Sequence, residues 1–116
     1  MGLPRRNRLT SGDDIERVLD TGRRVTRPEF VLYHCAREAP DATRIGFAVG
    51  RRIGKAVVRN RTRRILREGV RVLVPRLVPC DIVVVARPPV VRSGVRDLEA
   101  ALADATARAG LLLNDT

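Results

Sequence analysis

Residues 44–73 read RIGFAVGRRIGKAVVRNRTRRILREGVRVL, and the spacing of the apolar residues changes half-way through this stretch. In the first part, large apolar residues alternate with small ones, which predicts a strand over residues 44–50. One face of this strand would carry Ile45, Phe47 and Val49, and the other would carry Gly46, Ala48 and Gly50. The first face is suited to packing in a core. The second is nearly bare backbone, and it is either covered tightly by a helix or left open as a shallow groove.

The second part of the stretch predicts a helix over residues 57–73, because its apolar residues recur at intervals of three and four. One face would carry Val58, Thr62, Ile65, Leu66, Gly69, Val72 and Leu73, and the opposite face Asn60, Arg63, Arg64, Arg67 and Arg71, flanked by Arg59 and Arg61. Like charges four residues apart destabilise a helix, so folding alone does not explain the arginine face. The pattern therefore predicts a surface that binds a polyanion.

The segment before this stretch contributes a helix and another strand. Ser11 is a suitable N-cap, and the apolar pattern that follows it ends at Gly22. The run FVLYHC at 30–35 is rich in residues that favour strands. Because the turn at 38–41 is short, we expect this strand to pair directly, and antiparallel, with the strand at 44–50.

The segment after it contributes a strand and a helix. DIVVVAR at 81–87 is continuously apolar between its charged ends, which is typical of a strand buried on both faces. Ser93 is expected to cap a last helix, which ends at Gly110. The order of the elements predicts an α+β domain, with helices packed on a small mixed sheet.

The composition fits one domain with a polyanionic partner. We assign residues 1–116 to a single domain, with an N-terminal arm at 1–10 and a C-terminal tail at 111–116 as candidate flexible ends. The net charge of +10 favours nucleic acid first and an anionic membrane surface second. Because the sequence shows neither a secretory signal nor an apolar run that could cross a bilayer, we expect a cytoplasmic protein.

Candidate catalytic and metal-binding residues are sparse. His34 is the only histidine, and no nucleophile is matched to it in the sequence. Cys35 and Cys80 lack the spacing of metal ligands, and the sequence leaves their redox state open. No two carboxylates lie among apolar residues as an acid–base pair would. We therefore expect neither a catalytic residue nor a metal site in this chain.

The surroundings of the basic helix indicate which polyanion it binds. A DNA-recognition helix usually has a partner helix joined by a short turn, whereas strands flank this one, and Gly50 and Gly54 are expected to make the turn into it. A membrane-surface helix would carry large apolar residues where this helix has Thr62 and Gly69. Structured RNA, or RNA with single-stranded parts, fits better than DNA or a membrane.

The segment KAVVRNRTRRILRE at 55–68 resembles the RNR signature of the protein subunit of bacterial ribonuclease P. Further segments resemble that family in the same order, namely RNRL at 6–9, FVLY at 30–33, RIGFAVGRRIG at 44–54 and DIVVVARP at 81–88. The resemblance implies an α–β sandwich of the order α-β-β-β-α-β-α, with a mixed sheet like that of domain 2 of ribosomal protein S5. It also implies a left-handed βαβ crossover, although such crossovers are almost always right-handed.

The resemblance further implies an activity shared with an RNA. In that family the RNA subunit removes the 5′ leader of precursor tRNA by hydrolysis that needs Mg²⁺, which is bound mainly by the RNA. The protein, a monomer within the ribonucleoprotein, binds the leader and promotes affinity for metal and substrate. The residues matched to the surface that contacts the RNA subunit are Arg52, Lys55, Arg59, Asn60, Arg61, Arg63, Arg64 and Arg67.

The resemblance also places the leader in a groove between the first helix and the sheet. The residues that match its lining are Ile15, Leu19, Tyr33, Gly46, Ala48 and Gly50. Tyr33 would stack on a base. Ile15 and Leu19 stand where the family commonly has phenylalanine, so they either contact the leader or only pack the core.

Two other functions are weighed against this one. A non-catalytic RNA-binding protein, for example a ribosomal protein, would carry a similar basic surface but would not support cleavage by ribonuclease P RNA. A nuclease acting alone would need an acid–base constellation, which the sequence does not suggest.

Overall fold

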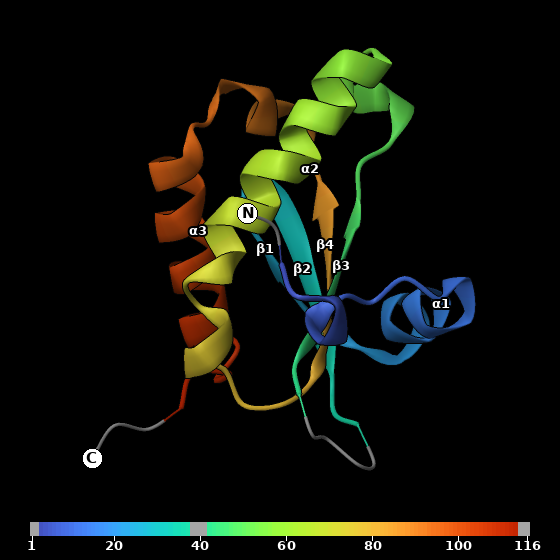
Figure 1. The fold of residues 1–116 in the computed structure, drawn as a ribbon, viewed down its shortest axis with the longest axis vertical. Coiled ribbons are helices and arrows are strands. Elements are labelled where there is room, and N and C mark those ends of the chain that lie inside the picture. The colour runs from blue at the N-terminus through green and yellow to red at the C-terminus, as the bar shows by residue number, and fades with distance from the viewer. Residues whose placement is uncertain (1–2, 38–41, 114–116) are drawn as a thin grey trace.

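A computed structural model describes residues 3–37 and 42–113 of the chain (Figure 1). Its main elements are α1 (Gly12–Thr21), β1 (Arg23–Thr26), β2 (Phe30–Cys35), β3 (Arg44–Ala48), α2 (Ala56–Arg71), β4 (Asp81–Ala86) and α3 (Val95–Arg108). The α+β class and the order α-β-β-β-α-β-α agree with the prediction. The turn expected at 38–41 lies outside the described residues.

The four strands form one mixed sheet in the order β1-β2-β4-β3. Strand β2 pairs antiparallel with both β1 and β4, and β3 pairs parallel with β4. The predicted direct pairing of β2 with β3 is therefore wrong, because β4 lies between them. The reason is the apolar character of β4 on both faces, which suits a central position: Ile82 and Val84 belong to one buried cluster and Val83 to another.

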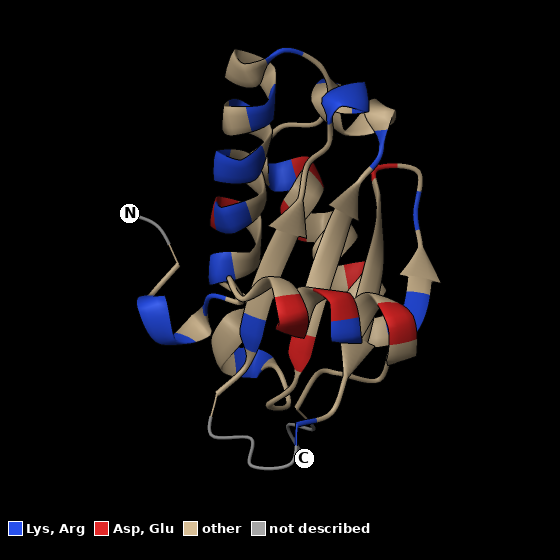
Figure 2. Cartoon of the chain, turned by 90° about the vertical axis from the view of Figure 1, so that its right-hand side faces the viewer, with Lys and Arg blue, Asp and Glu red and all other residues tan. Residues whose placement is uncertain are grey.

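Helices α2 and α3 cover one face of the sheet, and α1 crosses the other (Figure 1). When α2 faces the viewer and the strands run upward, β4 lies to the left of β3, and the turned view agrees (Figures 1 and 2). The β3-α2-β4 crossover is therefore left-handed, as the resemblance implied and against the usual preference.

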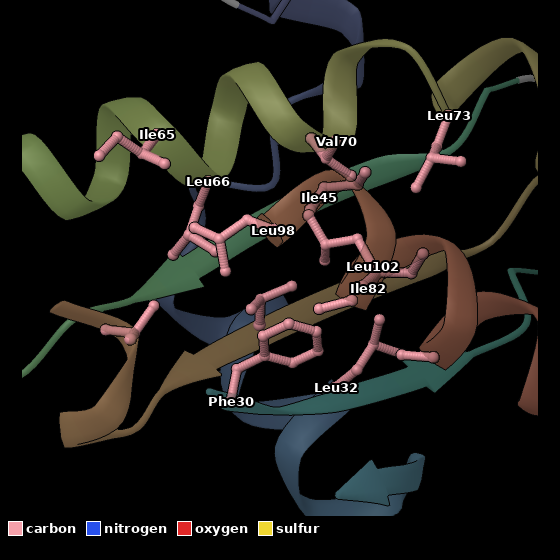
Figure 3. Close-up of a cluster of buried hydrophobic side chains, with 14 of the residues drawn as sticks. Phe30, Leu32, Ile45, Ile65, Leu66, Val70, Leu73, Ile82, Leu98 and Leu102 are labelled. Carbon is pink, nitrogen blue, oxygen red and sulfur yellow. The ribbon is translucent and has the colours of Figure 1, made fainter. Parts of the chain in front are cut away.

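The main core lies between the sheet and the pair of helices α2 and α3 (Figure 3). Phe30 of β2, Leu66 of α2 and Leu98 of α3 are almost completely excluded from solvent. Gly69 allows the two helices to approach closely, because a Cβ at this position would lie 3.2 Å from Cδ1 of Leu102. A small residue on the apolar face of α2 thus has a packing role.

The structure corrects two details of the expected helices. Val70 is buried and Val72 is 49% exposed, because Val70 shares the face of Leu66 whereas Val72 follows the last helical residue. The N-cap of α3 is Gly94, whose N–H donates to the Asp97 carboxylate at 3.0 Å. Ser93 does not have this role because it ends the preceding 3-10 turn.

Both candidate flexible ends pack against the domain over their described residues. Leu3 and Leu9 of the arm are buried, and the N–H of Leu9 donates to the carbonyl of Ile45 in β3 at 3.0 Å. Leu111 is buried as well, and Leu112 forms a bridge with Leu77. Among the described helices, none has both the length and the apolar character to cross a membrane.

Candidate RNA interface

The basic surface begins at the turn that leads into α2. Gly54 follows the 3-10 turn Arg51–Ile53 with φ 147°, a conformation that favours glycine, and a Cβ there would lie 3.2 Å from Val58. Gly54 therefore makes the turn predicted for it. Gly50 has an ordinary φ of −82°, and a Cβ at this position would meet no heavy atom within 4 Å, so the turn does not require a glycine there.

The residues predicted to contact the RNA subunit all lie on α2 or immediately before it. Bands of basic residues follow α2 along its whole length (Figure 2). The exposed members are Arg52, Lys55, Asn60, Arg61, Arg64 and Arg67, and the half-buried members are Arg59 and Arg63. The helix thus carries basic residues along its length, with Glu68 as the one acid among them.

The arginines of this surface lack acidic partners. In residues 3–37 and 42–113, no carboxylate oxygen lies within 4.0 Å of a guanidinium nitrogen of Arg61, Arg64 or Arg67. Arg63 Nη1 donates only to a neutral group, Oδ1 of Asn60, at 2.7 Å. Unpaired positive charge at this density is relieved by binding an external anion.

Arg59 has one unsatisfied donor inside the protein. Its Nε atom is buried, and it has no hydrogen-bond partner among the described atoms. Buried N–H groups almost always have an acceptor, because leaving one unsatisfied costs about 1–3 kcal/mol.

A separate group of arginines is neutralised inside the protein. Asp81, the first residue of β4, has a side chain with 0% exposure. It accepts hydrogen bonds from Arg44 Nε at 3.0 Å and Nη2 at 2.8 Å, and from Arg17 Nη2 at 2.5 Å. Nε of Arg37 lies 3.5 Å from Oδ1 of Asp81. Sequence analysis missed this cluster, although an acid at the start of a buried strand was a signal for it.

The cluster positions α1 across the sheet, because Arg17 belongs to α1, Arg44 to β3 and Asp81 to β4. Desolvation by itself would raise the pKa of Asp81, but the hydrogen bonds from Arg44 and Arg17 outweigh it and hold that pKa below its ordinary value. The carboxylate is therefore ionised at neutral pH and ties the three elements together.

The face of the sheet beneath α1 contains most of the predicted leader groove. Tyr33, Val83 and Gly46 are aligned across β2, β4 and β3. Ile15 and Leu19 of α1 and Tyr33 of β2 are half-buried and pack against the buried cluster of Leu9, Val18 and Val83. Ile15 and Leu19 therefore pack the core and are also partly exposed on the side of the expected groove.

The three small residues predicted to line the groove lie in different environments. Gly46 is buried under the arm and α1, since a Cβ there would lie 2.8 Å from the Leu9 carbonyl oxygen and 3.6 Å from Cδ1 of Ile15. Ala48 is half-buried and Gly50 is exposed. Because Gly46 has no side chain, the arm can lie against the sheet at this position. The accessible part of this face lies toward Ala48.

The remaining reactive side chains are one histidine and two cysteines. Burial, and secondly the charge of Arg23, lower the pKa of His34. Cys35 and Cys80 are free thiols, and burial raises the pKa of Cys80 to about 11. Among the described residues, no three His, Cys, Asp or Glu side chains are grouped so that they could hold a metal ion.

Comparison with known proteins identifies the family. The model of the Ribonuclease P family matches residues 3–110. The chain belongs to the ribonuclease P protein family. The ribonuclease P protein component of Symbiobacterium thermophilum is 42% identical over 106 residues, which cover 90% of this chain and 92% of that protein. That of Bacillus velezensis is 36% identical over 87 residues, which cover 75% of each chain.

Solved ribonuclease P proteins share the fold. The protein from Staphylococcus aureus is 28% identical and superposes with a TM-score of 0.84 over 92% of this chain and 98% of that one. The protein from Thermotoga maritima, solved with 1-(4-fluorophenyl)-2-thiourea, is 25% identical with a TM-score of 0.75 over 84% of this chain and 94% of that one. The α+β sandwich with a mixed sheet is thus the fold of this family.

Proposed function

We propose that this chain binds a ribonuclease P RNA through α2 and helps it to remove the 5′ leader of precursor tRNA. Membership of the family supports a role as a subunit of ribonuclease P. The observation that carries the proposal further is the set of exposed arginines on α2, Arg61, Arg64 and Arg67, for which residues 3–37 and 42–113 provide no carboxylate within 4.0 Å. The phosphates of an RNA supply the missing acceptors.

The hydrolysis itself is assigned to the RNA. The RNA mainly binds the Mg²⁺ that the reaction uses, and the protein raises affinity for metal and substrate by reducing repulsion between phosphates. No step is assigned to a side chain of this protein.

The leader is assigned to the sheet face beside α1. Tyr33 offers an aromatic ring, and Ile15 and Leu19 offer partly exposed apolar surface next to it. Base–aromatic stacking contributes about 1–3 kcal/mol per base and tolerates any sequence, as a protein that handles many leaders requires. The alternative of a ribosomal protein shares the basic helix, but the family assignment favours ribonuclease P.

The proposal is tested by cleavage of a precursor tRNA at low Mg²⁺ with a bacterial ribonuclease P RNA. We expect the protein to restore cutting at the mature 5′ end and to cut nothing without the RNA. A protein that binds this RNA no better than unrelated RNA, and restores no cleavage, would support the ribosomal alternative. Cutting by the protein alone would support a nuclease that acts without RNA.

A further inference from the structure

A hollow of about 230 Å³ lies where the N-terminal arm passes between α1 and α2, at the outer edge of β3. The buried residues that line it are Leu3, Leu9, Ile45 and Gly46, and half-buried Ile15 and Phe47 line it as well. Its volume is several times the roughly 30 Å³ that one water molecule occupies in the liquid. The hollow is therefore larger than a bare phosphate ion needs.

Three arginines converge on this hollow: Arg8 from the arm and Arg63 and Arg67 from α2. Nε of Arg8 donates to the carbonyl of Leu3 at 2.7 Å, but across the described ranges no carboxylate lies within 4.0 Å of any of the three guanidinium groups. The protein does neutralise arginines elsewhere, around Asp81. Charge left unpaired at the rim of a hollow favours an anionic ligand.

The edge of β3 adds polar groups to the hollow. The carbonyl of Ile45 accepts from Leu9, so the main chain of Ile45 points outward, away from β4. Main-chain direction alternates along a strand, so the N–H and C=O of Phe47 lie on the same outer edge. The pairing with the arm ends at Leu9, and within the described chain no main-chain group outside the sheet bonds to Phe47. A donor and an acceptor therefore lie side by side at the hollow.

We propose that the hollow holds one unpaired nucleotide of the ribonuclease P RNA. Its phosphate would bind the three arginines, its base would pack against Phe47 and Ile15, and the main chain of Phe47 would hydrogen-bond the edge of the base. A paired base cannot enter, because both its edge and its faces are occupied in the duplex. The RNA subunit is the source because Arg63 and Arg67 belong to the α2 surface, so this inference rests on the proposed function.

A photo-crosslink tests which nucleotide occupies the hollow. Thr10 is exposed and lines the hollow, so p-benzoyl-L-phenylalanine is placed at this position and crosslinked within the complex of protein, RNA subunit and precursor tRNA. Primer extension on the RNA subunit and on the precursor then maps the crosslinks. We expect one dominant site at an unpaired nucleotide of the RNA subunit. Crosslinks to the leader, to paired nucleotides or to many scattered positions would overturn the proposal.

Two arginines of the arm provide a matched pair of variants. Arg8→Ala removes a charge from this hollow, whereas Arg6→Ala removes the same charge from a different hollow near the C-terminal end of α2. We expect Arg8→Ala to weaken binding of the RNA subunit about tenfold, the loss of one charge-assisted contact. Chemical protection of the crosslinked nucleotide should be lost in Arg8→Ala and kept in Arg6→Ala.

A double-mutant cycle separates binding from folding effects, because Arg8→Ala also removes the bond to Leu3. Removing the base of the crosslinked nucleotide should weaken binding of the unmodified protein about tenfold. Removing the same base should weaken binding of the Arg8→Ala protein by a smaller factor, because the two changes act on one contact. Independent effects would overturn the proposal. Normal cleavage at low Mg²⁺ with a misplaced crosslink would overturn this inference while leaving the proposed function intact.

Discussion

The Asp81→Asn substitution tests whether the buried ion cluster holds α1 on the sheet. The change keeps the size of the side chain but removes the charge that three arginines share. Breaking a buried ion pair typically costs about 3–5 kcal/mol. The side chains of Arg17 and Arg44 are 39% and 25% exposed, so water compensates part of the loss. We therefore expect a loss of about 3 kcal/mol in the free energy of unfolding.

Thermal and urea denaturation measure this loss. In a domain of this size, each kcal/mol of lost stability lowers the melting temperature by about 4 °C, so Tm should fall by about 12 °C. The matched control is Asp104→Asn, since Asp104 is 45% exposed and also accepts from an arginine, Arg27 Nη1, at 2.6 Å. A surface pair contributes less than about 1 kcal/mol. If Asp81→Asn destabilised the protein no more than Asp104→Asn does, the cluster would not have the structural role inferred for it.

The same variant has a pH signature. The folded-state pKa of Asp81 lies below the unfolded value of about 3.9, so its stabilisation is complete above that pH and is lost as the pH falls through the folded pKa. The difference in stability between the unmodified protein and Asp81→Asn should thus be constant from about pH 5 to 8 and shrink below about pH 4. A difference that stayed constant in acid would show that the charge of Asp81 is not its source.

Three further outcomes are expected. Replacing Arg63, Arg64 and Arg67 together with Ala should weaken binding of the RNA subunit and lower the slope of log K against log salt by about 0.7–0.9 per lost phosphate contact; an unchanged slope would remove these residues from the interface. Tyr33→Ala should weaken binding of precursor tRNA to the holoenzyme, by up to about 3 kcal/mol, but not binding of mature tRNA; equal losses would exclude contact with the leader. Because burial raises the pKa of Cys80 to about 11, alkylation at about pH 8 should modify this thiol only as fast as the protein opens, and rapid modification in the native state would contradict its burial.

Periodicity and charge in the sequence were enough to place most elements and the basic surface. The apolar face of α2 had to pack on the core, so Arg63, Arg64 and Arg67 had to lie together on the outer side of the helix, whatever the rest of the fold. In the same way, the continuous apolar run of β4 required burial on both faces. The RNR segment and its neighbours indicated the family, which comparison with known proteins confirmed.

The order of the strands and the close contacts of the arm depended on tertiary structure. A short connection suggested that β2 and β3 pair, but the need to bury both faces of β4 placed that strand between them. The sequence left open whether the face of Gly46 is covered, and the structure places Leu9 of the arm against it. The Asp81 cluster and the hollow beside Arg8 each join residues from segments far apart in the chain. Local patterns do not specify the partners in such contacts, because packing of the whole domain decides which distant side chains meet.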